Sequence, residues 1–110
     1  MKFEMYLISK KGEFSAKAIY SDGTIIVKAG TKIRMSFADH IRGGKATKKY
    51  RDDPTIVDER GITKKDCNFT SPSTAAQFVM GSSVNGWYAW HIDKKTNLKK
   101  YMELLGKGNV

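Results

Sequence analysis

The sequence has a single cysteine and lacks any long apolar run. Because Cys67 alone cannot form an internal disulfide, a disulfide-stapled secreted fold is excluded and a reducing, cytoplasmic location is expected. No apolar stretch approaches the roughly 20 residues that a membrane-spanning helix requires, so we expect no membrane partner. The apolar run at the N-terminus is interrupted by Glu4 and no small-residue cleavage site follows it, which argues against a signal peptide.

Residues that typically carry catalysis are also sparse. His40 and His91 stand alone, and no H-x-x-x-H or C-x-x-C spacing points to a metal site. Adjacent carboxylates such as Asp52 and Asp53 are typical of helix starts and exposed surfaces. We therefore expect a protein that is not an enzyme, with no catalytic residue, no metal and no cofactor. A pairing of Cys67 with His91, which would revive an enzymatic hypothesis, stays open.

Positive charge is what the sequence has in excess. Twenty Lys and Arg stand against 11 Asp and Glu, giving a formal net charge of +9 over 110 residues, a length typical of one domain. A domain this basic is attracted to polyanions, of which nucleic acid is the commonest. The alternative is that the lysines only keep the surface soluble.

The first 37 residues predict an antiparallel β-meander of three or four strands. Apolar and polar residues alternate along most of this region, and tight turns separate the alternating runs. Asp22 and Gly23 predict one such turn, because aspartate and glycine tolerate the positive φ that two-residue hairpins require. The expected strands span residues 3–9, 14–20, 24–28 and 32–37.

A basic, glycine-containing stretch follows the predicted meander. Gly43 and Gly44 would be costly inside a regular element, so we expect a flexible, exposed loop at about 41–51. Such a loop can neutralise several phosphates, and the alternative is that it is merely solvated. Its candidate nucleic-acid-binding residues are Arg42, Lys45, Lys48, Lys49, Tyr50 and Arg51.

Two helices and one extended segment are expected between residues 50 and 105. A short helix is predicted over residues 50–60, with Pro54 near its first turn and Gly61 at its end. A strand or extended connection should follow at residues 62–68. Helical spacing of apolar side chains predicts a C-terminal helix over residues 97–105 that ends at a glycine.

A further helix is predicted over residues 74–80. Ser71 or Ser73 can cap its first N–H groups, Pro72 is compatible with its entry, and Gly81 is the expected stop. Small alanine side chains within this helix would allow it to approach a sheet closely. Together with the meander, these elements predict an α+β fold in a single domain spanning residues 1–110.

The segment after this helix predicts a turn and a strand. Asn85 begins an Asn-Gly turn and is expected to adopt a left-handed conformation. The following strand should span residues 87–92. Extended geometry places Trp87 on one face, where we expect it in the core, and Tyr88 and Trp90 together on the other face.

Five residues in this central region are further candidates for contacts with nucleic acid. Ser71 and Ser73 could seat a phosphate at a helix N-terminus, although simple capping explains them equally. Asn85 could read a base edge instead of adopting a turn conformation. Tyr88 and Trp90 could stack an unpaired or flipped base, worth about 1–3 kcal/mol per base, and so could Trp87 if it lay outside the core; the alternative is that these rings pack in the core.

Several motifs in the chain resemble the DUF4357 family. Residues 69–76 read FTSPSTAA, and residues 84–87 read VNGW, with Trp90 three positions further on. Residues 14–18 read FSAKA and precede an Asp-Gly hairpin, as in the N-terminal part of the family. The same central motifs are similar to the RAMA domain. The stretch at 41–51 departs from the family pattern because it is more basic and richer in glycine.

The resemblance implies a function without assigning a chemistry. The DUF4357 family has no established activity, but its members accompany nucleases and restriction-type proteins, and the RAMA domain is proposed to sense modified DNA. We therefore expect a non-catalytic DNA-binding module linked to restriction, defence or mobile elements. The alternative is a protein–protein inhibitor or adaptor that acts on a nucleic-acid enzyme, using either its positive face or its acidic segment at residues 52–59.

Overall fold

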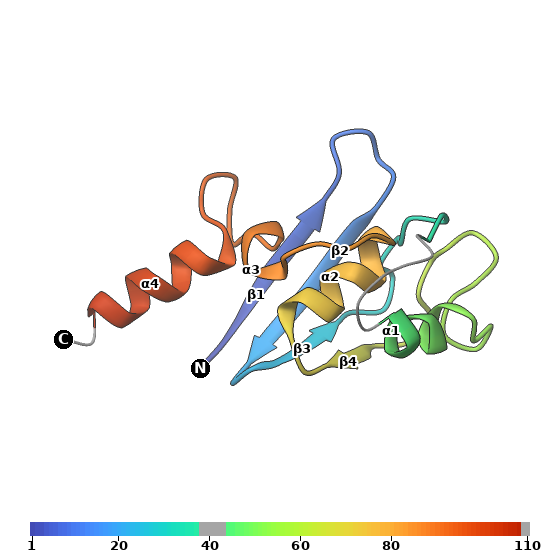
Figure 1. Ribbon diagram of the computed structural model, residues 1–110, viewed down its shortest axis with the longest axis horizontal. Helices are drawn as coiled ribbons and strands as arrows, with labels where there is room; N and C mark the ends of the chain where they lie inside the picture. Colours follow the sequence, from blue (N-terminus) through green and yellow to red (C-terminus); the bar gives the residue numbers. More distant parts are fainter. Residues whose placement is uncertain (38–43, 109–110) are drawn as a thin grey trace.

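The computed structural model describes residues 1–37 and 44–108. Within these residues a four-stranded antiparallel sheet is combined with helices, which confirms the expected α+β fold (Figure 1). In chain order the elements are β1 (Lys2–Ile8), β2 (Ser15–Ser21), β3 (Thr24–Val27), α1 (Gly44–Arg51), β4 (Cys67–Phe69), α2 (Pro72–Met80), α3 (Gly86–Ala89) and α4 (Leu98–Gly108).

The sheet has the strand order β1-β2-β3-β4, and each neighbouring pair is antiparallel. The turn between β2 and β3 is the predicted one: Asp22 has a φ of 48° and Gly23 a φ of 90°, between the paired residues Ser21 and Thr24. Two consecutive positive φ angles match the turn whose twist suits the flanking strands. This local signal was sufficient to predict the hairpin.

The fourth strand is not the expected one. Residues 32–37 form no strand, and β4 pairs with β3 instead. The backbone N–H of Ile33 donates to Gly61 and that of Arg34 to Val79. The polar backbone groups of this segment are therefore satisfied by a turn and by the C-terminal end of α2, so the segment needs no neighbouring strand.

Residues 44–51 form helix α1, where a flexible loop was expected, and this part of the prediction was wrong. Residues 41–43, which include Arg42, and the side chain of Lys45 lie outside the described residues. The side chain of Thr47 is buried on the inner side of α1. A short basic sequence is a weak helix former by itself, so its packing against the rest of the fold supplies the stability.

The helix expected over residues 50–60 is also not formed. After α1, the carboxylate of Asp53 accepts a hydrogen bond from the backbone N–H of Thr55 (2.9 Å), and that of Asp58 accepts one from Ile62 (3.0 Å). Side chains that hydrogen-bond to nearby backbone groups compete with helix formation. The segment therefore folds as a series of aspartate-stabilised turns.

Helix α2 lies across one face of the sheet (Figure 1). Its caps are the predicted ones: Ser71 accepts a hydrogen bond from the Thr74 N–H (3.1 Å), and Gly81 ends the helix with a φ of 70°. Ala75 and Ala76 are fully buried, as expected for a helix that approaches the sheet closely. The largest fully buried side chains around it are Trp90, Phe78, Met5, Ile25, Ile33 and Leu98.

A single helical turn, α3, replaces the strand expected over residues 87–92. Asn85 is its N-cap, with a φ of −86° in place of the expected left-handed conformation, and its side chain accepts the Trp87 N–H at 3.0 Å. Gly86 is pressed against Pro72, because an added Cβ would lie 2.1 Å from the Pro72 carbonyl carbon. The Asn-Gly pair therefore starts a helix and allows a close approach to α2.

Helix α4 contacts α3 and projects from the body of the molecule, whose principal extents are 47 × 26 × 26 Å (Figure 1). It continues to Gly108, past the stop expected at Gly106. Near its start the Tyr101 ring meets Phe3 of β1 edge-on, with 4.8 Å between centroids. Among the described residues, no helix combines the length and apolar character needed to cross a bilayer.

Candidate nucleic-acid interface

The arginine of α1 is directed into the fold. Arg51 donates from Nε to the carbonyl of Phe78 (2.9 Å) and, more weakly, from Nη2 to that of Val79 (3.5 Å). Its guanidinium lies 4.9 Å from the centroid of the Phe37 ring. Burial lowers the pKa of Arg51 to about 10, so the group stays charged at neutral pH. Arg51 therefore satisfies carbonyls at the C-terminal end of α2 and is a poor candidate for binding phosphate.

The aromatic residue of α1 is also used internally. The Tyr50 ring packs edge-on against Phe69 (5.3 Å between centroids) and Phe78 (6.0 Å). Its hydroxyl donates to the carbonyl of Asn68 at 3.3 Å. These contacts join α1 to β4 and α2, and they hold the Tyr50 ring away from a stacking position on the surface.

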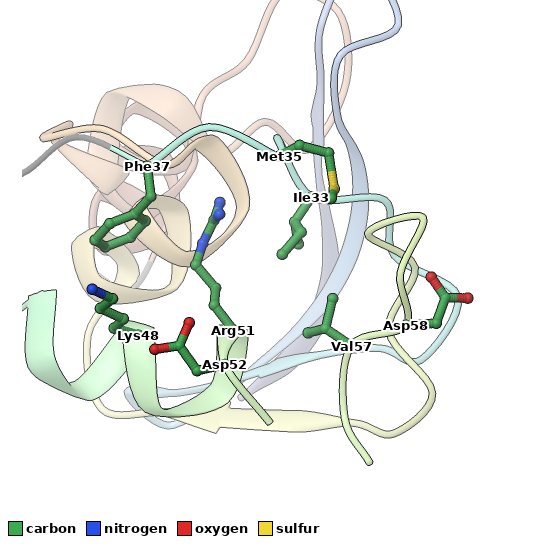
Figure 2. Close-up of a pocket in the computed structure, with 8 residues that line it drawn as sticks. All are labelled: Ile33, Met35, Phe37, Lys48, Arg51, Asp52, Val57 and Asp58. Atoms are coloured by element: carbon green, nitrogen blue, oxygen red, sulfur yellow. The ribbon is translucent and has the colours of Figure 1, made fainter. Parts of the chain in front are cut away.

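A small cavity lies beside α1 (Figure 2). In this view Arg51 rises from α1 between Phe37 and Ile33. The cavity volume is about 160 Å³, well below the roughly 300–1,000 Å³ that ligand pockets typically enclose. It therefore does not form a small-molecule site. Its lining residues are Ile33, Met35, Phe37, Lys48, Arg51, Asp52, Val57 and Asp58.

The two serines at the start of α2 make internal hydrogen bonds. Ser71 caps the helix and also shares a hydrogen bond with the Thr74 hydroxyl (2.9 Å). Ser73 accepts the backbone N–H of Gly86 at 3.0 Å, which ties α3 to α2. Helix capping and the attachment of α3 account for both hydroxyl groups, and this favours the structural alternative for these residues.

The two tryptophans occupy the opposite positions from those expected. Trp90 is fully buried, and its indole Nε1 donates to the Pro72 carbonyl at 3.0 Å. Trp87 is 36% exposed and Tyr88 is 53% exposed. The expectation that Tyr88 and Trp90 share an outer face was wrong, because residues two apart in a helical turn point to nearly opposite sides, so Tyr88 lies outside while Trp90 returns to the core.

Exposed lysines follow the aromatic pair in the chain, and one of them contacts a ring. The Lys99 ammonium lies 5.7 Å from the centroid of the Tyr88 ring and donates to Glu103 at 2.6 Å, a hydrogen bond that raises the pKa of Lys99. Lys94, Lys95 and Lys100 are exposed and make no salt bridge within residues 1–37 and 44–108. We name this surface the aromatic–lysine corner: Trp87, Tyr88, Lys94, Lys95, Lys99 and Lys100.

Sequence reasoning missed most of this corner. Asn85 was proposed to read a base edge, but its side-chain oxygen caps α3. Trp87 was assigned to the core, and the lysines between residues 94 and 100 were not considered. The asparagine at residue 85, a residue type that favours the N-cap position, was the signal that indicates a helical turn.

Groups with catalytic potential are not assembled into a site within the described residues. Cys67 is buried in β4, and burial raises the pKa of its thiol to about 11, which disfavours the reactive thiolate. The ring Nδ1 of His91 lies 2.8 Å from the carbonyl oxygen of Ala89. No group of three His, Cys, Asp or Glu side chains within this part of the chain is placed to hold a metal ion. His40 lies outside the described residues.

Comparison with known proteins identifies the family and no activity. No curated protein and no solved structure matches the chain significantly. The match is to a family model described as a domain of unknown function, DUF4357, and it covers residues 6–102. This range includes most of the sheet, α2, the N-cap asparagine and the tryptophan turn described above. The chain therefore belongs to the DUF4357 family.

Proposed function

We propose that this protein is a non-catalytic nucleic-acid-binding module, with DNA as its expected ligand. The observation that carries the proposal is how the surface charges are used. Several carboxylates are matched one to one with a cation, which leaves the excess lysines without a salt bridge. The matched pairs are Glu4 with Lys17, Glu13 with Arg34, Asp66 with Lys28, and Glu103 with Lys99.

Unmatched lysines lie on exposed surfaces of the described fold, and seven of them fall at three places. They occur on the turn after β1, on α1, and in the aromatic–lysine corner. Cations without a protein counter-charge can neutralise phosphates and release the counterions condensed on them. The lysines concerned are Lys10, Lys11, Lys48, Lys49, Lys94, Lys95 and Lys100.

The biological setting in this proposal comes from the family resemblance. A link to restriction, defence or mobile elements, and a cytoplasmic location, would place the module where DNA is accessible. Neither follows from the fold, because a fold does not define a function. The proposal therefore stands on the charge arrangement, and the setting is a consequence to be examined once binding has been measured.

A salt titration tests the proposed function. Fluorescently labelled duplex and single-stranded DNA would be titrated with the protein between about 50 and 200 mM salt. We expect the logarithm of the association constant to fall linearly with the logarithm of the salt concentration, with a slope that reports the number of phosphates contacted. Lack of binding to either DNA at the lowest salt concentration would contradict the proposal.

A second candidate function is a protein–protein inhibitor or adaptor that acts on a nucleic-acid enzyme. It is favoured by α4, which projects from the body and carries Leu104 with half of its surface exposed beside the partly buried Tyr101 and Leu105. Capture from a lysate treated with nuclease separates the two functions. Recovery of a nucleic-acid enzyme that stays bound after nuclease treatment supports the second function, and loss of all partners supports the first.

A further inference from the structure

We infer that the aromatic–lysine corner binds unpaired nucleotides of single-stranded nucleic acid, with bases stacked on Trp87 and Tyr88 and phosphates held by the neighbouring lysines. The inference rests on the proposed function and deepens it, because it names the surface and the state of the strand. It depends on three features of the corner: its exposed rings, its rigid attachment and its charge.

Residues other than the two exposed aromatics attach α3 to the fold. The residues that secure this turn are Asn85, which caps it, Gly86, which approaches Pro72 closely, and Trp90, which is fully buried. The two rings between them remain 36% and 53% exposed. Two aromatic residues exposed at consecutive positions are available to a ligand, and exposed apolar patches mark binding sites more often than scattered single residues do.

The turn that carries the rings is firmly attached to α2. The backbone N–H of Gly86 donates to Ser73 (3.0 Å), and the indole of Trp90 donates to the Pro72 carbonyl (3.0 Å). One hydrogen bond therefore holds each end of α3. A platform that is ordered before binding loses less conformational entropy when a base stacks on it.

The charge of the corner suits phosphates that flank a stacked base. Lys99 already lies against the Tyr88 ring, at 5.7 Å from its centroid. The carboxylates nearby are engaged, since Asp93 accepts the backbone N–H of Lys95 (2.9 Å) and Glu103 accepts a hydrogen bond from Lys99. Aromatic rings interleaved with cations are the recurring composition of surfaces that bind single strands.

The corner should distinguish paired from unpaired bases, because its rings can stack only on an exposed face of a base. In a duplex both faces of each base pair are covered by neighbouring pairs, so surface rings can stack only on a base that has been flipped out. Unpaired bases expose these faces without that cost. The corner should therefore prefer a single strand, while duplex DNA would contact its lysines alone.

Other exposed surfaces of the described fold are less suited to this ligand. Helix α1 presents Lys48 and Lys49, but its aromatic residue is packed inward, as described above. The sheet face that carries Glu4 and Lys28 is partly neutralised by salt bridges with Lys17 and Asp66. The corner is the described surface where exposed rings and unmatched lysines coincide.

The decisive measurement compares three ligands with three proteins. Oligo-dT, oligo-rU and a duplex of equal length would each be titrated with the wild type, with Tyr88→Ala and with Tyr88→Phe, after circular dichroism has shown that the variants are folded. We expect Tyr88→Ala to weaken single-strand binding about fivefold or more, because one stacking contact is lost. Duplex binding should change less than about twofold, and Tyr88→Phe should retain most single-strand affinity because the ring remains.

Tryptophan fluorescence gives a local readout that does not depend on loss of affinity. The protein has two tryptophans, Trp87 exposed and Trp90 buried. Saturating oligo-dT should quench the wild-type emission by stacking on Trp87. In Trp87→Phe the remaining emission comes from Trp90, and we expect the quenching to disappear while binding, followed by anisotropy of the labelled oligonucleotide, persists.

The outcomes separate this inference from the proposed function. If the oligonucleotides bind but Tyr88→Ala and Trp87→Ala both retain full single-strand affinity, the inference is wrong while the proposed function stands. Equal losses on single strand and duplex also overturn it, because stacking on unpaired bases would not be the cause. If no nucleic acid binds at low salt, both fail. A selective loss on oligo-dT, oligo-rU or both supports the inference, and the pattern identifies DNA or RNA as the source of the strand.

Discussion

Helix α1 and the aromatic–lysine corner have similar compositions and opposite arrangements. Helix α1 ends in Lys48-Lys49-Tyr50-Arg51, and the corner combines aromatic residues with four lysines. In α1 the aromatic and guanidinium groups contact protein carbonyls and rings, and the lysines stay outside. In the corner the rings stay outside together with the lysines.

The two regions differ in the internal partners that the fold offers to their side chains. Arg51 meets the carbonyls at the C-terminal end of α2, which lack intrahelical partners and favour a cation. Next to the corner, Trp90 has a buried carbonyl to bind, whereas no hydrogen bond is recorded for the side chains of Trp87 and Tyr88 within the described residues. A basic, aromatic stretch is therefore a binding surface only where the fold offers its side chains no internal partner, and the sequence alone does not reveal this.

Replacing the inner tryptophan should have the largest effect on stability. We expect Trp90→Ala to lower the free energy of unfolding by about 3–5 kcal/mol, because a fully buried indole and its hydrogen bond are lost. The matched variant Trp87→Ala should cost less than about 1 kcal/mol. Urea unfolding followed by circular dichroism measures both. Similar losses in the two variants would remove the distinction between the anchoring and the exposed residues.

Replacing Arg51 should destabilise the protein by a smaller amount. We expect Arg51→Ala to cost about 1–2 kcal/mol, because the charge-assisted hydrogen bonds to α2 are lost. Arg51→Lys should restore part of this, since an ammonium lacks the planar fork of the guanidinium. The exposed Lys49→Ala is the matched control and should stay within about 0.5 kcal/mol of the wild type.

The labelling rate of the Cys67 thiol measures the effect of Arg51→Ala independently of the free energy of unfolding. Cys67 is buried in β4, and Phe69 of that strand packs against Tyr50 of α1. We expect Arg51→Ala to speed the reaction of Cys67 with a thiol reagent, because labelling requires local opening of the structure. An unchanged labelling rate in this variant, together with unchanged stability, would show that Arg51 is a surface cation like its neighbours.

The elements that were predicted correctly depend on local chemistry. The Asp22-Gly23 turn, the Ser71 cap and the Gly81 stop each follow from the conformational preference or hydrogen-bonding capacity of the residues themselves. Such signals act over two to four residues and need no knowledge of the fold. They also locate α2, which organises the core, and so the α+β architecture was accessible from the sequence.

The elements that were missed depend on distant partners. An Asn-Gly pair is compatible with a hairpin and with a helix start, and the close approach of Gly86 to Pro72 decides between them. The exposed positions of Trp87 and Tyr88 follow from that choice. The residue types of the candidate site were therefore partly predictable, while their directions were not.

Removing pairs of lysines should have a moderate effect on binding and distinguish the two regions. We expect Lys94→Ala/Lys95→Ala to reduce the salt dependence of single-strand binding by roughly one phosphate contact, which is a change in slope of about 0.7. Lys48→Ala/Lys49→Ala removes the same charge from α1 and should leave the slope nearly unchanged. Equal changes would indicate that single strands contact the whole basic surface.

Acid should loosen the segment next to α1 more than the corner. The backbone N–H of Ile62 lowers the pKa of Asp58, hydrogen bonds from Thr55 lower that of Asp53, and in the corner the N–H of Lys95 lowers that of Asp93. A carboxyl group whose pKa is lower in the folded state stabilises the fold at pH values above its unfolded pKa. This contribution is lost as the pH falls through the folded value.

Two such carboxylates hold the turns after α1, and one holds the loop before α4. As the pH falls below about 5, hydrogen exchange should therefore increase at the amides of Thr55 and Ile62 and at that of Lys95, and more of the chain should be affected after α1, where two carboxylates act, than before α4, where one does. Asp58→Asn keeps an acceptor that does not titrate, so its Ile62 amide should stay protected in acid. Equal loss of protection in both regions would mean that acid unfolds the whole domain together, and the turns next to α1 would then have no separate dependence on their carboxylates.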